Sequence, residues 1–281
     1  MTDSQTYLRM QKTQYAAQFA AFGDAGVVGH YDFHEQVPYE TLLLHLFGDV
    51  RRPIFPSFAG RTALDYGCGE GRMIRRLSHV FERVDGVDIS EDMANNARAR
   101  CAGSQVWTTS GADCADAQSE SYDFVYSTIA IQHIGSFDVR DSIIKDLWRV
   151  LKPGGKGTLQ MLFSKHYPYR SAGVLGQVGN TRVEIMPEDQ QHAGWFQNRF
   201  DARGTNSGCD TMIGTDDLPK IRAYFEAQQF TDVEFWFHDI SIGRGQPRIL
   251  PPTHPNSHID DNYWGTHFIF IHFTKPESAP A

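Results

Sequence analysis

A glycine-rich segment that directly follows a short apolar run constrains the fold of this chain more than any other feature. It reads TALDYGCGEGRMIRRL over residues 62–77, with Gly67, Gly69 and Gly71 at alternate positions. An apolar run, a glycine turn and a helix-like pattern together predict a strand–turn–helix unit. Glycine in such a turn lets the backbone bend sharply and lets a ligand approach closely. The motif alone is equally compatible with a purely structural turn, so its surroundings have to distinguish the two.

Strand and helix patterns alternate from residue 61 to residue 163. Alternation of this kind predicts an α/β, doubly wound fold in which a parallel sheet is flanked by helices. Right-handed crossovers then bring the carboxyl ends of the strands to one edge, where ligands bind. The expected strands are residues 62–66, 83–87, 105–108, 124–127 and 157–163, and the expected helices are residues 72–80, 91–100 and 139–150.

Two carboxylates indicate what the glycine loop holds. Asp65 stands two residues before the first glycine, and Asp88 ends the next expected strand. The loop spacing is G-x-G-x-G rather than the dinucleotide fingerprint G-x-G-x-x-G, and a carboxylate beside it would repel a pyrophosphate. An acid about 20 residues beyond such a loop is placed to accept hydrogen bonds from ribose hydroxyls. The pattern therefore predicts a nucleoside ligand that carries positive charge instead of phosphate.

Five motifs in order extend this interpretation: ALDYGCGEGR, VDGVDIS, SGADCAD, YDFVYSTIAIQHI and RVLKPGG. In this order and spacing they resemble the class I S-adenosylmethionine-dependent methyltransferases. The resemblance implies a Rossmann-like sheet of seven strands, mostly parallel with the last strand antiparallel, and S-adenosylmethionine as cofactor. It places Asp88 at the ribose, Asp113 near the adenine amino group, and Ala112 and Cys114 beside the adenine ring. The cofactor-binding residues that it implies are Asp65, Gly67, Gly69, Gly71, Asp88, Ile89, Met93, Ala112, Asp113, Cys114 and Ser127.

The segments outside these motifs predict additions around the substrate. We expect an N-terminal helical lid in residues 1–58, the cofactor-binding core in 59–164, a substrate cap in 165–214, and the rest of the sheet with an inserted loop in 215–281. Residues 1–29 are expected to form a helix that places Leu8, Tyr15, Phe19 and Phe22 on one face and is broken by the glycines at 23, 26 and 29. A second helix is expected in residues 37–47. A helix from Thr215, as N-cap, and an antiparallel strand pair in 231–240 and 266–274 complete the pattern.

His133 is the candidate catalytic residue. It follows the fourth strand, at the edge where methyl transfer is expected, and histidine is the commonest general base. The alternative is a structural histidine bonded to backbone. Tyr15, Tyr31, His34 and Trp195 are candidate substrate-binding residues, with ordinary core packing as the alternative for the aromatic ones.

The remaining histidines and cysteines do not predict a metal site or thiol chemistry. His254, His258, Asp260, Asp261 and His267 match no zinc signature, so we expect no metal and interpret them as part of a polar cap. Cys68 and Cys114 lie within cofactor motifs and are interpreted as small packing residues.

Charge and composition exclude several classes of partner. The 26 Lys and Arg against 34 Asp and Glu give a net charge of −8, and no basic run suits nucleic acid. No apolar stretch is long enough to span a membrane, and four scattered cysteines after a polar start indicate a cytoplasmic protein. We expect methyl transfer to oxygen or nitrogen of a small-molecule acceptor: a sugar, an amino-sugar or a natural-product intermediate. A protein methyltransferase, or a binding protein without transfer activity, is the alternative, and an oligomer is possible.

Overall fold

The computed structural model describes residues 4–28, 55–163, 176–178, 181–183, 193–198, 211–238, 249–250 and 267–277. Its helices are α1 (Ser4–Val28), α4 (Arg72–Leu77), α5 (Glu91–Arg100), α6 (Phe137–Val150) and α7 (Leu218–Ala227), with 3-10 turns η1 (Ile131–His133) and η3 (Thr215–Asp217). Its strands are β1 (Thr62–Tyr66), β2 (Arg83–Asp88), β3 (Val106–Thr108), β4 (Tyr122–Ser127), β5 (Leu151–Phe163), β6 (Gly176–Val178), β7 (Thr181–Val183), β8 (Ala193–Gly194), β9 (Thr211–Ile213), β10 (Thr231–His238), β11 (Ile249–Leu250) and β12 (His267–Thr274).

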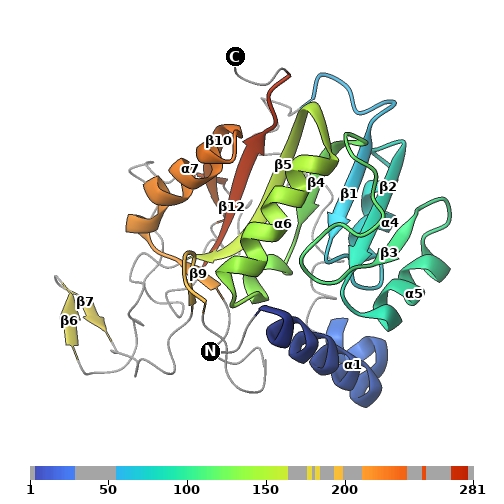
Figure 1. Cartoon of the computed structure of the whole chain (residues 1–281), viewed down its shortest axis with the longest axis horizontal. Coiled ribbons are helices and arrows are strands. Elements are labelled where there is room, and N and C mark those ends of the chain that lie inside the picture. Colours follow the sequence, from blue (N-terminus) through green and yellow to red (C-terminus); the bar gives the residue numbers. More distant parts are fainter. Residues whose placement is uncertain are drawn as a thin grey trace.

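One twisted sheet organises the molecule, and its strand order is β11-β10-β12-β5-β4-β1-β2-β3 (Figure 1). Strands β3, β2, β1, β4 and β5 pair in parallel. Strand β12 lies antiparallel between β5 and β10, where Ile271 is in register with both Leu159 and Phe235. The expected seven-stranded, mostly parallel sheet with an antiparallel last strand is confirmed. Three short strands, β8, β9 and β11, extend it, and β9 pairs in parallel with the end of β5.

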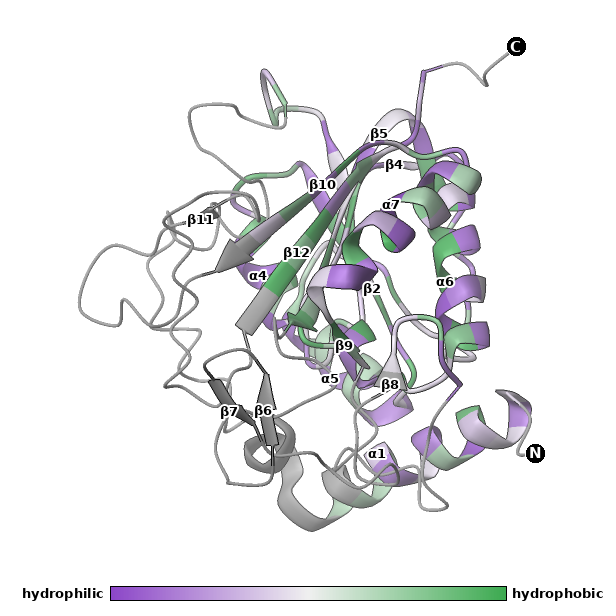
Figure 2. Ribbon diagram, turned by 90° about the vertical axis from the view of Figure 1, so that its left-hand side faces the viewer, coloured by the Kyte–Doolittle hydropathy of each residue, from purple (hydrophilic) through white to green (hydrophobic). Residues whose placement is uncertain are grey.

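Helices cover both faces of the sheet and enclose two apolar cores (Figure 2). Alternation along the strands divides the side chains, so that Leu64 and Val125 belong to the core under α6 and α7. Ala63 and Phe124 point to the opposite face, into the core under α4 and α5. Because the sheet is fully covered at its centre, the loops at the strand ends are the part left to bind a ligand.

The N-terminal helix, expected in residues 1–29, extends from Ser4 to Val28 and ends directly before Gly29. It continues through Gly23 and Gly26, so the expectation that these two glycines break it is wrong. Its side chains are described for residues 4–17 and at residue 20, so Phe19 and Phe22 lie outside the described side chains. The second expected helix, residues 37–47, also lies outside the described residues. None of the helices within the described ranges is long and apolar enough to cross a membrane.

Three other boundaries differ for local reasons. Helix α4 ends at Leu77 instead of residue 80. Strand β5 begins at Leu151 instead of residue 157, because Gly154 and Gly155 exchange backbone hydrogen bonds with Lys275 after β12. The expected N-cap Thr215 lies in a 3-10 turn, and α7 starts at Leu218 with a proline in its first turn.

Candidate active site

A cavity of about 380 Å³ opens where β1, β2, β3 and β4 end. Its wall contains Tyr66 and Asp88 from two strand ends, together with Thr109 and Thr128, which directly follow the next two. Helix α1 passes the same edge of the sheet (Figure 1) and contributes Tyr7, Leu8, Gln11 and Tyr15. The volume falls in the range of about 300–1,000 Å³ that is usual for sites that bind small ligands.

The glycine loop lines this cavity, and its glycines serve two purposes: one permits a close backbone approach and another leaves space for a ligand. Gly67 has a φ of +78°, and a Cβ there would lie 2.3 Å from the Cβ of Ala130, so only glycine permits this close approach. Gly69 has a φ of +54°, and a Cβ there would have no atom within 4 Å. The space beside Gly69 is therefore open to a ligand. Gly71 lies behind the loop, where a Cβ would lie 2.3 Å from the Sγ of Cys101.

Asp88 ties the loop to the end of β2. Its Oδ2 accepts a hydrogen bond from the Gly69 amide at 2.8 Å, and its Oδ1 accepts one from the Ser90 amide at 2.8 Å. Burial raises the pKa of this carboxyl, and the two amide donors act in the opposite direction. Each carboxylate oxygen has a second lone pair, so Asp88 retains acceptor capacity toward a ligand in the cavity.

Asp65 lies in the cavity wall at the end of β1 and is only 1% exposed. Its Oδ1 is buried close to the hydroxyl of Tyr126, its register partner on β4, and neither atom has another hydrogen-bond partner among the described residues. Burial raises the pKa of Asp65 to about 8, against the effects of Tyr126 and of the positive charge of Arg72. A buried carboxyl in the wall of an open cavity is suited to bind a cationic group.

The segment after β4, residues 128–135, carries His133 and is called the His133 turn. Five of its residues line the cavity: Thr128, Ile129, Ala130, His133 and Ile134. The side chain of His133 is half-buried. Ile129 has a φ of +60°, a conformation that is strained for a β-branched residue. Strain of this kind persists only where surrounding contacts enforce it, and it is commonest at functional sites.

The loop after β3 contributes Thr109 and Gly111 to the wall, whereas Asp113 and Cys114 are not part of it. Asp113 accepts hydrogen bonds from Thr109 Oγ1 at 2.7 Å and from Ser110 Oγ at 2.5 Å. Partial burial raises the pKa of Asp113, but these hydrogen bonds outweigh it, and the pKa is lowered. Asp113 therefore stabilises the conformation of this loop through hydrogen bonds within it.

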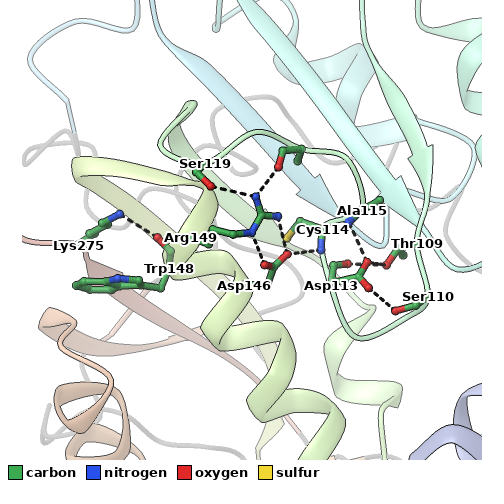
Figure 3. Close-up of polar contacts among 11 residues, drawn as sticks. Thr109, Ser110, Asp113, Cys114, Ala115, Ser119, Asp146, Trp148, Arg149 and Lys275 are labelled. Carbon is green, nitrogen blue, oxygen red and sulfur yellow. Dashed lines mark hydrogen bonds and ion pairs between the residues drawn. The ribbon is translucent and has the colours of Figure 1, made fainter.

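The same loop is fastened to α6. The Cys114 amide donates to Asp146 Oδ2 at 2.6 Å, and Asp146 pairs with Arg149 (Figure 3). Burial raises the pKa of the Cys114 thiol well above its usual value, which agrees with a packing role. This network connects the third and fifth motifs of the sequence.

The structure thus places some expected site residues in the cavity wall and others outside it. In the wall are Asp65, Gly67, Gly69, Asp88, Ile89, Met93, His133 and Tyr15. Gly71, Ala112, Asp113, Cys114, Ser127 and Trp195 are described but lie outside the wall. Ser127 and Trp195 are each 1% exposed, and Trp195 belongs to the core under α6 and α7. Tyr31, His34, His254, His258, Asp260 and Asp261 lie outside the described residues, as does the side chain of His267.

Sequence reasoning missed several residues of the wall. Leu8 carries the helix periodicity, but Tyr7 and Gln11 lie on the same wall without a local signal. Thr109 and Thr128 follow strand ends directly, and that position is the one signal that would have indicated them.

The residues present fit S-adenosylmethionine. The space at Gly69 accommodates a ligand close to the backbone, the buried Asp65 carboxyl suits an ammonium group, and Asp88 keeps lone pairs for hydroxyl donors. Ile89 and Met93 add apolar surface beside these polar groups. The donor set therefore matches a nucleoside that carries positive charge.

Comparisons with known proteins agree. A model of the methyltransferase domain matches residues 64–159. The malonyl-(acyl-carrier protein) O-methyltransferase of Salmonella typhimurium is 32% identical over 149 residues, which are 52% of this chain and 53% of that protein. The ubiquinone biosynthesis O-methyltransferase of Xanthomonas oryzae pv. oryzae is 31% identical over 173 residues, 55% of this chain and 70% of that protein. The chain spans about half the length of the first curated relatives that it matches.

Solved structures share the fold at low identity. The DhpI complex with S-adenosylhomocysteine has a TM-score of 0.55 at 14% identity and covers 98% of this chain and 100% of that one. Phosphoethanolamine N-methyltransferase 2 of Haemonchus contortus, solved with phosphomonomethylethanolamine and S-adenosylhomocysteine, has a TM-score of 0.53 at 19% identity and covers 85% of this chain and 52% of that one. With 31% identity across more than two thirds of a methyltransferase, and with the sheet order that its motifs imply, the chain belongs to the class I S-adenosylmethionine-dependent methyltransferase family.

Proposed function

We propose that this protein transfers the methyl group of S-adenosylmethionine to an oxygen or nitrogen atom of a small-molecule acceptor. The observation that carries the proposal is a single cavity whose wall contains the glycine loop, both carboxylates and His133. The two curated relatives are named as O-methyltransferases and the Haemonchus protein as an N-methyltransferase, which supports these two acceptor atoms.

The proposed cofactor contacts follow from the groups in the wall. Asp65 binds the amino group of the cofactor, and Asp88 accepts from its ribose hydroxyls. Asp113 acts indirectly, because it holds Thr109, which lies in the wall. Bound S-adenosylmethionine supplies an activated sulfonium methyl, so the protein has mainly to position the acceptor and exclude water.

His133 is the proposed general base. It is half-buried in the wall, on the segment that faces the glycine loop through the contact of Ala130 with Gly67. When the acceptor atom attacks the methyl carbon, its O–H or N–H proton passes to a ring nitrogen of His133. Segment 165–214 is the proposed cap over the acceptor, of which β9 pairs with the sheet beside β5.

The first test is calorimetric titration of the protein with S-adenosylmethionine and S-adenosylhomocysteine, with NADH as the control ligand. We expect micromolar binding of the first two ligands and none of NADH. Sugars, amino-sugars, phenols and primary amines are then screened for formation of S-adenosylhomocysteine. Turnover only with protein acceptors would overturn the small-molecule assignment.

The second test addresses His133. His133→Gln is expected to lower kcat about 10²- to 10⁴-fold while the affinity for S-adenosylhomocysteine stays at the wild-type value. His79→Gln, at an exposed position outside the cavity wall, is the matched control and should leave both unchanged. Equal kcat values for His133→Gln and wild type would exclude His133 as the base.

A further inference from the structure

The His133 turn is strained, and side chains from three other elements, α1, α6 and β9, hold its backbone. Ile129 has a φ of +60°, and Ala130 packs against the glycine loop at Gly67. Two backbone hydrogen bonds within the turn, His133 to Ala130 and Ile134 to Ile131, form only a single helical turn. Its conformation therefore depends on external partners.

Tyr7 of α1 is the first partner. Its hydroxyl accepts a hydrogen bond from the Gly135 amide at 2.8 Å and donates to the His133 carbonyl at 3.4 Å. The residue is 0% exposed, so both bonds are shielded from water. Tyr7 thus fixes the backbone on both sides of Ile134 and docks α1 against the cavity at the same time.

Arg140 and Thr211 are the other partners, and they meet at one atom. The carbonyl of Ile134 accepts from Thr211 Oγ1 at 2.7 Å and from the Arg140 guanidinium, which also donates to Thr211 Oγ1 at 2.6 Å. Arg140 is 0% exposed, and its hydrogen-bond partners among the described residues are neutral oxygens rather than a carboxylate.

Arg140 also reaches the segment that precedes β9. Its guanidinium donates to the carbonyls of Gly194, Trp195 and Gln197 and lies 5.7 Å from the centre of the Trp195 ring. An unpaired buried charge is costly, and both terminal nitrogens of Arg140 have acceptors, whereas its Nε has none among the described residues. The positions of residues 194–197, of β9 and of the His133 turn are therefore linked through one side chain.

We propose that Tyr7 and Thr211, with Arg140 as their common support, are positioning residues that hold the His133 turn in the conformation that presents His133 to the cavity. Correct docking of α1 and of β9 then sets the geometry of the proposed base. The inference rests on the proposed function for the role of His133, but the contacts themselves are measurable without an acceptor.

The test uses two conservative variants of the ligand-free protein. Tyr7→Phe keeps the ring and removes both hydrogen bonds, and Thr211→Val keeps the shape and removes the hydroxyl. Amide hydrogen exchange is measured on peptides that cover residues 128–136. The imidazole NMR signal of His133, assigned by its loss in His133→Gln, reports the surroundings of the ring.

Tyr7→Phe removes the buried acceptor of the Gly135 amide and is expected to speed its exchange about tenfold. Thr211→Val removes one of the two donors to the Ile134 carbonyl and is expected to speed this exchange about threefold. Both variants should shift the His133 signal. Tyr7→Phe should also weaken S-adenosylhomocysteine binding, because α1 lines the cavity, whereas Thr211→Val should leave that affinity unchanged.

Two controls remove equivalent buried hydroxyls elsewhere. Tyr122 lies at the start of β4, away from the His133 turn, and Tyr122→Phe removes its 2.8 Å hydrogen bond to Asp85 of β2. Thr158→Val removes a 2.9 Å contact with His272. Both should leave the His133 turn and its histidine signal at wild-type values, while Thr158→Val shifts the signal of His272. Wild-type exchange and an unshifted His133 signal in Tyr7→Phe and Thr211→Val would overturn the inference. Failure of the wild-type protein to bind S-adenosylhomocysteine would instead contradict the proposed function.

Discussion

The two sides of the cavity are built in different ways. On the side of β1, β2 and β3, short-range contacts hold the groups proposed to bind the cofactor: Gly69 to Asp88 spans 19 residues and Thr109 to Asp113 spans four. On the side of the His133 turn, Tyr7 and Gly135 are 128 residues apart, and Thr211 and Ile134 are 77 apart. The cofactor side is thus contained within consecutive strand–helix units, whereas the reacting side is assembled from remote segments. Each side should respond to its own mutations, except at Tyr7, which also lines the cavity.

Replacing Trp195 by alanine should have the largest effect on stability. The side chain is buried on the reacting side and contacts Tyr224 and Phe225. Its loss should lower the free energy of unfolding by about 3–5 kcal/mol, measured by denaturant titration. Affinity for S-adenosylhomocysteine, measured where the variant is folded, should not change. Phe196→Ala, at a neighbouring side chain that is 40% exposed, is the control and should cost about 1 kcal/mol or less. A large loss of affinity in Trp195→Ala would show that the two sides are not independent.

Asp88→Ala tests the cofactor side directly. The substitution removes the acceptor of the Gly69 and Ser90 amides and the proposed ribose contact. Affinity for S-adenosylmethionine should fall by about 1.5–3 kcal/mol, measured by calorimetry. Asp92→Ala, an exposed aspartate in the first turn of α5, serves as the matched control. Wild-type affinity in Asp88→Ala would refute the placement of Asp88.

Asp65 should make cofactor binding dependent on pH. With its pKa raised to about 8 by burial, Asp65 is mostly protonated at pH 7 in the free protein. Pairing with an ammonium group favours the carboxylate, so binding releases a proton and affinity rises between pH 6 and 7.5, by at most about tenfold per unit. Above this window the α-amino group of the ligand, with a pKa of about 7.7–8.0, begins to lose its charge. Calorimetry in buffers of different ionisation enthalpy measures the released proton.

Asp65→Asn provides the control for this linkage, since it should remove both proton release and the rise in affinity. The same raised pKa means that the folded, ligand-free protein binds more protons than the unfolded chain between pH 3.8 and about 8. The contribution of Asp65 to stability therefore declines as the pH rises through this range. Proton release of zero at pH 7 in the wild type would contradict a neutral Asp65.

Asp113→Ala should have the smallest effect of the four. Its carboxylate lies outside the cavity wall and accepts hydrogen bonds from Thr109, Ser110 and the Ala115 amide. The substitution should lower the free energy of unfolding by about 1 kcal/mol and the affinity for the cofactor only a few-fold. Unfolding by guanidinium chloride measures the change in stability, and calorimetry measures the change in affinity. A loss of affinity as large as that of Asp88→Ala would indicate direct contact with the adenine, as the sequence motif implies.

Local signals predicted the cofactor side well. Strand β1 and helix α5 have the expected bounds, and α5 begins after the N-cap Ser90 with Glu91 and Asp92 in its first turn. The glycine loop and Asp88 lie together because one strand–helix unit follows another in a parallel sheet. Pattern and topology therefore suffice where contacts are short-range.

The reacting side was not predictable in the same way. The sequence pattern of α6 predicts that Arg140 is an ordinary polar residue of an amphipathic helix. In the structure it is fully buried, because carbonyls from residues 194–197 accept its hydrogen bonds. Trp195, expected at the substrate, is packed in the core. Tyr7 lies next to the periodic Leu8 without a signal of its own. Such roles depend on which remote segments meet, and residue spacing carries no information about that.

The position of β12 has a consequence for the order in which the molecule is built. Residues 267–274 lie between β5 and β10, so neither of these strands has its full set of pairing partners until that late segment has been synthesised. The parallel strands β1 to β4 need only residues up to 127 to pair with one another. On the ribosome, the cofactor side is therefore complete in sequence while β5 still exposes an unpaired edge. Unpaired strand edges are prone to aggregation, and pairing between strands that are far apart in the sequence forms slowly. Chaperone dependence during synthesis should accordingly concentrate on the interval between the emergence of β5 and that of β12.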